Sequence, residues 1–174
     1  MTGINPAEVS RRLAAGAAMA ISDARGKAFE AVAEYMFTEL GCQVRANLVS
    51  PFHSEQIDLA VAHIGHLAPL PNFFLVECKY WEKPIDSAAV GYFINICQNR
   101  NVPLAVIVSK LGMTGNAVDA KNAHSLAYAA AMRGTHLVLL TEANLLSATS
   151  NDVLTVMLVR AWMEAVATGG VGSP

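Results

Sequence analysis

The chain has 174 residues, the length of one domain, and 53% of them are hydrophobic whereas 15% are charged. This balance excludes a disordered chain, which needs low hydrophobicity and high charge. The formal net charge of −2 excludes a generally basic coat for nucleic acid, although a local basic patch is compatible with it. The three cysteines have no close-spaced pair, so reduced thiols in the cytoplasm are expected. Without a run of about 18 apolar residues, no membrane-spanning helix is expected.

Two helices are predicted at the start of the chain. An alanine-rich helix over 6–20 has little bulk to bury, so residues 1–22 are interpreted as a helical arm. In the next helix, apolar residues recur at the spacing of one helix face. Ser22 or Asp23 is expected to cap its start and Gly41 to end it. Its apolar face is expected to hold Phe29, Val32, Ala33, Met36, Phe37 and Leu40.

Three strands are predicted next, at residues 43–49, 56–62 and 73–80, because side chains alternate between the two faces of a strand. The apolar faces of the first two are expected to consist of Val44, Ala46 and Leu48 and of Ile57, Leu59 and Val61. The short connections between the three strands favour an antiparallel meander.

The pattern in the later half of the sequence predicts helices that alternate with short, continuously apolar strands, as in a parallel sheet covered on both faces. The expected elements are a helix at 86–99 capped by Asp86 or Ser87, a strand at 104–109, a helix at 115–133, a strand at 136–140 and a helix at 151–167. We therefore expect an α/β fold with a single domain over residues 23–168 and a flexible tail over 169–174.

Charged residues inside two of the apolar strands are the strongest indication of chemistry. Asp58, Glu77 and Lys79 interrupt QIDLAV and FFLVECKYW, and a buried charge is costly unless it is paired or binds a metal. Glu77 and Lys79 are two residues apart and share a sheet face. Two converging carboxylates suit Mg²⁺, and a neighbouring ammonium can orient a water or stabilise negative charge. These groups suffice for metal-assisted phosphodiester hydrolysis, whereas the competing interpretation is a structural ion-pair cluster.

The spacing of these three residues resembles the PD-(D/E)xK nuclease superfamily, with 18 residues between Asp58 and Glu77-Cys78-Lys79. GKAFEAVAEYMFTELGCQV at 26–44 resembles the first helix and strand of Mrr-type restriction endonuclease domains, and VIVSKLGMTGNAVDAKNAH at 106–124 resembles their later strand, loop and helix. The resemblance covers about residues 25–145. It implies a restriction-endonuclease-like fold, a mixed central β-sheet flanked by helices with the core order αβββαβ.

The resemblance also implies a role for individual residues. Asp58 and Glu77 would bind Mg²⁺ or Mn²⁺ together with the backbone carbonyl of Cys78, and Lys79 would be the catalytic lysine. Glu30 resembles the first-helix glutamate that reaches the site through water. Gln98 resembles a polar residue that some relatives direct at the site.

The expected function is therefore Mg²⁺-dependent hydrolysis of phosphodiester bonds, with DNA as substrate, as in restriction and defence systems. Two alternatives stay open: a catalytically inactive nucleic-acid-binding or assembly subunit on the same fold, and a resolvase-like nuclease that recognises DNA structure. Because no separate recognition domain is evident, a homodimer or a partner subunit is expected to supply targeting. Residues 80–84, YWEKP, either stack on a base or close the edge of the sheet.

Overall fold

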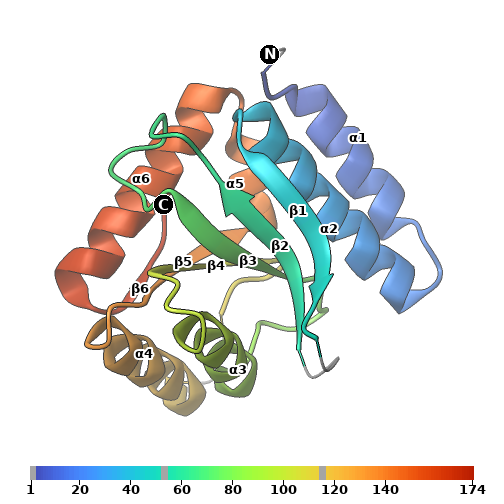
Figure 1. The fold of residues 1–174 in the computed structure, drawn as a ribbon. Coiled ribbons are helices and arrows are strands. Elements are labelled where there is room, and N and C mark those ends of the chain that lie inside the picture. The colour runs from blue at the N-terminus through green and yellow to red at the C-terminus, as the bar shows by residue number, and fades with distance from the viewer. Residues whose placement is uncertain (1–2, 52–54, 114–116) are drawn as a thin grey trace.

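A mixed sheet with the strand order β1-β2-β3-β4-β5-β6 lies at the centre of the protein (Figure 1). The computed structural model describes residues 3–51, 55–113 and 117–174. The antiparallel meander consists of β1 (Gln43–Val49), β2 (Gln56–Ala62) and β3 (Phe73–Lys79). The parallel half adds β4 (Leu104–Ser109), β5 (His136–Thr141) and β6 (Val171–Gly172). Both the predicted meander and the predicted parallel arrangement are confirmed.

Helices cover both faces of this sheet. One face carries α1 (Pro6–Ala17), α2 (Ser22–Glu39), α5 (Glu142–Ser147) and α6 (Asn151–Thr168), and the other carries α3 (Ser87–Gln98) and α4 (Ala117–Ala131). The protein thus has the predicted α/β class with helices on both faces. None of the described helices is long and apolar enough to cross a membrane.

Local signals explain where the helices begin and end. Asp86 caps α3 by accepting a hydrogen bond from the Ala89 N–H at 3.0 Å, as predicted. α2 differs, because its N-cap is Ile21 and no side chain caps it. At the other end of α2, Gly41 has a left-handed φ of 87° and donates to the Thr38 carbonyl at 2.9 Å. Gly41 therefore ends α2 as expected, since glycine adopts this conformation without strain.

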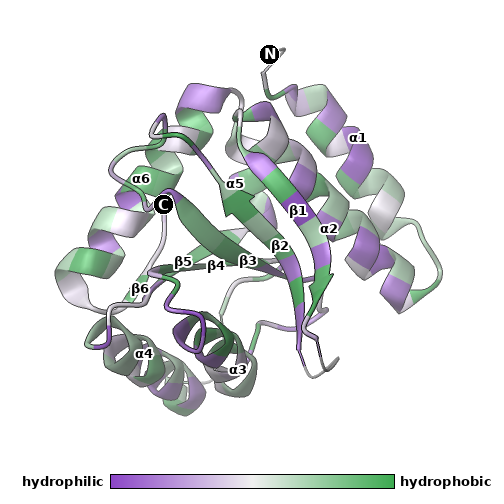
Figure 2. Ribbon diagram, in the orientation of Figure 1, coloured by the Kyte–Doolittle hydropathy of each residue, from purple (hydrophilic) through white to green (hydrophobic). Residues whose placement is uncertain are grey.

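The two apolar cores lie on opposite faces of the sheet, and β4 is buried along its whole length between them. Figure 2 shows the hydrophobic colour concentrated in the strands in the middle of the sheet. Burial of this apolar surface stabilises the fold by about 25 cal/mol per Å². The continuous apolar sequence of β4 follows from this double coverage.

The β1–β2 hairpin turns over halfway along its length. Ala46 and Leu59 face the core beneath α2, whereas Leu48 and Ile57 pack in the core on the α3 side. The expectation of one apolar face for each strand is therefore wrong at Leu48 and Ile57. The change coincides with Asn47, whose φ of 54° is left-handed inside a strand, a conformation that asparagine tolerates better than most residues.

The C-terminal residues differ from the expected flexible tail. Val171 and Gly172 form β6 and pair with Leu137 and Val138 of β5. Gly172 is needed there, because a side chain at that position would collide with the backbone of Ala161 in α6. The tail thus extends the sheet because a glycine allows its close approach to α6.

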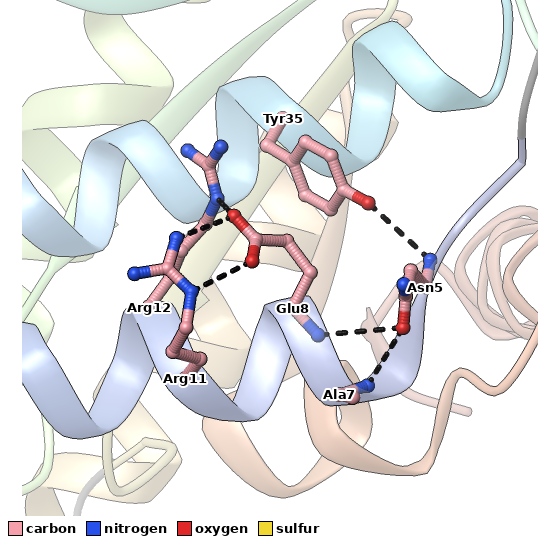
Figure 3. A network of polar contacts seen from close by, with 6 residues as sticks. All are labelled: Asn5, Ala7, Glu8, Arg11, Arg12 and Tyr35. Carbon is pink, nitrogen blue, oxygen red and sulfur yellow. Dashed lines mark hydrogen bonds and ion pairs between the residues drawn. The ribbon is translucent and has the colours of Figure 1, made fainter.

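The N-terminal arm packs closely on α2. Val9 and Leu13 of α1 are buried, and Gly16 lets the two helices approach at Ala28. Polar contacts add to this packing (Figure 3): the Glu8 carboxylate accepts from the Nε atoms of Arg11 at 2.8 Å and of Arg12 at 2.7 Å. The Arg12 guanidinium lies 4.6 Å from the ring centroid of Tyr35, and the Tyr35 hydroxyl accepts from the Asn5 N–H at 3.3 Å. The arm is therefore part of the packed structure.

Candidate active site

Strands β2 and β3 separate at the level of the predicted site. Their pairing runs from Ala62–Phe73 to Leu59–Val76. Beyond that pair, the Asp58 carboxylate accepts a hydrogen bond from the Cys78 N–H at 2.8 Å. A side-chain oxygen thus satisfies a buried strand N–H that would otherwise need a partner. This fork holds one carboxylate of the site at a defined distance from β3.

The second carboxylate and the lysine lie on β3 beside Asp58. Only 8% of Asp58 and 6% of Glu77 is exposed. The Lys79 Nζ lies 2.5 Å from the Glu77 Oε1, as expected for residues two apart on one strand face. The Lys79 side chain is more exposed, at 27%. Lys79 therefore links a buried acid to the accessible surface.

Burial and charge act together on these groups. Burial, followed by the nearby Asp58 carboxylate, raises the pKa of Glu77 to about 7, and Lys79 opposes this shift. Burial by itself would lower the pKa of Lys79, but the Glu77 carboxylate outweighs it, so the lysine pKa stands above its ordinary value. The site consequently holds an acid that is costly to ionise next to a stably charged ammonium.

α2 contributes a third acid and a second lysine. Burial raises the pKa of Glu30, Lys27 opposes the shift, and the charge of Asp58 adds to it, so Glu30 lies within electrostatic reach of the fork. The Lys27 Nζ lies 2.8 Å from the Glu30 Oε2 and 2.5 Å from the Asn47 Oδ1. The Gln56 Nε2 lies 3.5 Å from the same Asn47 oxygen. Asn47, the left-handed residue of β1, thus connects β1 and β2 to the α2 side of the site.

A cleft of about 350 Å³ lies between these groups. Its lining residues come from the first half of α2, the start of β2 and the end of β3: Ser22, Asp23, Gly26, Lys27, Glu30, Gln56, Cys78, Lys79, Tyr80 and Trp81. Glu30 and Lys79 line it directly, and both lie within electrostatic reach of the buried Asp58 and Glu77. The structure therefore brings four of the predicted side chains to one place.

Gln98 lies elsewhere. It ends α3 at the opposite end of the parallel strands from Lys79, and its Oε1 accepts from Arg133 at 3.5 Å. It lines a separate hollow with Asn95, Asn101 and Thr135. The expectation that Gln98 joins the site is not met, because α3 runs antiparallel to β3 and carries its last turn away from the cleft.

Sequence reasoning missed Lys27, Asn47 and Gln56 as site residues. The sequence indicated Lys27 only as a residue on the flank of a predicted helix, and Gln56 only as the first residue of a predicted strand. Asn47 occupies a polar position in an alternating pattern, and nothing in that pattern indicates a left-handed backbone. An asparagine inside a strand is the one signal available, since asparagine is depleted in strands.

The donor atoms at the fork fit a hard divalent cation. Among the described residues no group of three or more His, Cys, Asp or Glu side chains is arranged to hold an ion by itself. However, the Glu77 Oε2 is buried and has no hydrogen-bond partner there. Mg²⁺ takes one or two carboxylates and completes its shell with waters and other oxygens. Asp58 and Glu77, with the carbonyl of Cys78, match this requirement, and the unpartnered Glu77 oxygen is free to coordinate.

The mixed sheet with an acidic cleft at its fork defines a restriction-endonuclease-like protein. Residues 21–148 match the family Mrr_cat, which is described as restriction endonuclease. This match spans well over half of the chain, so the chain belongs to the Mrr restriction endonuclease family. The resemblance seen over residues 25–145 is thereby confirmed. Comparisons with curated proteins and with solved structures gave no match.

Proposed function

We propose that this chain is a Mg²⁺-dependent endonuclease that hydrolyses phosphodiester bonds in DNA, with Mn²⁺ as a substitute ion. Membership of a restriction endonuclease family implies phosphodiester hydrolysis. The observation that carries the proposal is that Glu30 and Lys79 line one cleft and lie within electrostatic reach of the buried Asp58 and Glu77. The three cysteines of the chain are buried and form no disulfide, which fits the reducing cytoplasm where restriction and defence enzymes act.

Each residue has a distinct task in this proposal. Asp58, Glu77 and the Cys78 carbonyl hold the Mg²⁺, which supplies Lewis acidity toward a phosphate oxygen when bound. The Lys79 ammonium donates a hydrogen bond that orients the attacking water, and its charge offsets the negative charge that grows on the phosphate. Glu30 accepts a hydrogen bond from water at the α2 side of the cleft. Lys27 and Asn47 hold Glu30 in place.

The test is cleavage of supercoiled plasmid with Mg²⁺ and with EDTA. Asp58→Ala and Lys79→Ala should each reduce cleavage by about 10²-fold or more, the usual effect of removing one such group. Lys121→Ala, which removes an exposed lysine of α4, is the matched control and should cleave like the wild type. If Asp58→Ala cleaves plasmid as fast as the wild type, the assignment of the active site is overturned.

A second measurement separates ion binding from catalysis. Mg²⁺ that binds only the folded protein raises its melting temperature. We expect this rise in the wild type and in Lys79→Ala, and its loss in Asp58→Ala, because Lys79 is not a ligand. DNA binding without Mg²⁺-dependent cleavage in the wild type would instead favour the inactive binding subunit. Preference for branched over linear DNA would favour the resolvase-like enzyme.

A further inference from the structure

A second pocket adjoins the cleft on the side away from β2. It has a volume of about 560 Å³ and shares Ser22, Tyr80 and Trp81 with the cleft. Its remaining lining residues are Arg25, Glu82 and Lys83. We call it the Trp81 pocket. Because Trp81 lines both hollows and is only two residues beyond Lys79, a ligand in the pocket would adjoin a ligand in the cleft.

The Trp81 pocket is lined by two basic side chains and one acidic side chain, and the acid has a lysine partner outside the pocket. Glu82 is paired with Lys110, whose Nζ lies 2.8 Å from the Glu82 Oε2. The Lys83 Nζ lies 3.6 Å from the Asp86 Oδ2, and its side chain is 71% exposed. The Arg25 guanidinium donates to the Met19 carbonyl at 3.1 Å and lies within electrostatic reach of Glu82, and a guanidinium has further N–H donors that a ligand could use. The pocket therefore offers a guanidinium and an ammonium to an anion, whereas the buried carboxylates of Asp58 and Glu77 beside the cleft suit a cation.

Trp81 adds an aromatic surface between two ammonium groups. The Nζ atoms of Lys79 and Lys83 lie 5.7 and 5.5 Å from its ring centroid. Tyr80 packs on Phe29 of α2 at 5.3 Å and so anchors this stretch of chain to the core. Lys83 is exposed and can leave the ring when a planar ligand stacks there. An aromatic ring beside basic side chains is the arrangement that single-stranded nucleic acid stacks on.

We propose that the Trp81 pocket binds one unpaired nucleotide next to the scissile phosphate, with its base on the Trp81 ring and its phosphate on Lys83 and Arg25. A base inside a duplex is stacked on its neighbours, so only an unstacked base can lie on a protein side chain in this way. The inference rests on the proposed nuclease function. It narrows the proposed substrate to DNA that already has an unpaired nucleotide beside the cut, or in which binding unpairs one.

Tryptophan fluorescence tests this pocket without any cleavage. The chain has two tryptophans, and Trp162 lies apart from the pocket against His136 at 5.1 Å. A single-stranded oligothymidylate, added in EDTA, should quench the emission of the wild type and of Trp162→Phe. The quenching should be absent in Trp81→Phe. Covalently closed duplex DNA should quench far less than the single strand.

Affinity supplies the second readout. Trp81→Ala should weaken binding of the oligothymidylate by about ten- to a hundredfold, the effect of losing one base–aromatic stack. Lys83→Ala removes an exposed side chain, so it leaves the fold intact. It should lower the slope of log affinity against log salt by about one. Thermal melting of each variant identifies any loss of folding.

The outcomes separate this inference from the proposed function. Quenching that persists in Trp81→Phe, or wild-type affinity in folded Trp81→Ala, would overturn the pocket while Mg²⁺-dependent plasmid cleavage still stood. Equal quenching by closed duplex would overturn the requirement for an unpaired base. If the wild type does not cleave plasmid at all, the proposed nuclease function is overturned. Trp81-dependent binding measured in EDTA would still support the pocket.

Discussion

The environment of Glu77 affects both the pH dependence of stability and the proposed binding of an ion. It is a buried carboxyl with one oxygen on Lys79 and the other without a hydrogen-bond partner among the described residues. Burial and Asp58 raise its pKa to about 7. An acid of this kind destabilises the fold when it ionises, and a bound cation removes that cost. This environment supports the proposal that Glu77 binds a cation.

The pH dependence of stability follows from this pKa. The unfolded chain ionises Glu77 near its ordinary value of 4.5, and the folded protein near 7. Between these values the unfolded state binds fewer protons, so the free energy of unfolding falls as the pH rises from 4.5 to 7. The fall is about 3 kcal/mol at about 1.4 kcal/mol per unit. In Glu77→Gln, urea unfolding at pH 5 and pH 8 should lack this contribution.

Glu34→Gln on α2 is the matched control and should keep the wild-type change between pH 5 and pH 8. Mg²⁺ in the buffer should reduce the wild-type change, because it favours the ionised carboxylate. A Glu77→Gln variant that loses stability toward pH 8 as steeply as the wild type would contradict the role of Glu77 in this dependence.

At the level of elements, the approach of α1 to α2 depends on a glycine. A Cβ at Gly16 would lie 2.8 Å from the Cβ of Ala28, whereas a Cβ at Gly26 would meet no atom within 4 Å. Both glycines lie inside helices, where alanine is usually favoured by about 1 kcal/mol. The two positions thus separate helix propensity from helix packing within one pair of helices.

Gly16→Ala and Gly26→Ala should therefore change stability in opposite directions. Gly26→Ala should raise the free energy of unfolding by about 0.5–1 kcal/mol. Gly16→Ala should lower it by about 1 kcal/mol, because the added methyl overpacks the contact with Ala28. Urea unfolding of the two variants measures the difference. Equal stabilisation by both substitutions would mean that α1 is free to move off α2.

At the scale of the whole molecule, charge is concentrated at the site. The net charge of −2 gives little general attraction for DNA. Two buried carboxylates, Asp58 and Glu77, lie beside the cleft, and two basic side chains, Arg25 and Lys83, line the adjoining Trp81 pocket. In the proposed function, affinity for DNA would therefore depend on a bound cation and a few local contacts, and one such cleft among the described residues would serve both strands of a duplex.

We expect a homodimer or a complex with a partner subunit when both strands are cut. Light scattering at the concentration of the cleavage assay should report a dimer, and plasmid should be linearised rather than only nicked. The rate of linearisation should rise more steeply than linearly with protein concentration when two chains must meet. A monomer that linearises plasmid with a rate proportional to concentration would contradict this expectation.

Much of the fold was predictable because its strands carry strong local patterns. The bounds predicted at 43–49, 56–62 and 104–109 match β1, β2 and β4. The short helix α5 was not predicted. Its six residues are too few for helical periodicity, and it begins at a capping box between Thr141 and Asn144. The elements that could not be predicted from the sequence are those whose length or pairing depends on neighbouring elements.

The sequence by itself determined the fold class, and it predicted Asp58, Glu77 and Lys79 as site residues because charges inside apolar strands are visible in the pattern. Glu30 was predicted only from the family resemblance. The tertiary structure decided that Gln98 lies away from the cleft and that Lys27 and Asn47 belong beside it. It also decided that the hairpin turns over at Asn47 and that the last residues form β6. Each of these depends on contacts between residues distant in sequence, which no local pattern encodes.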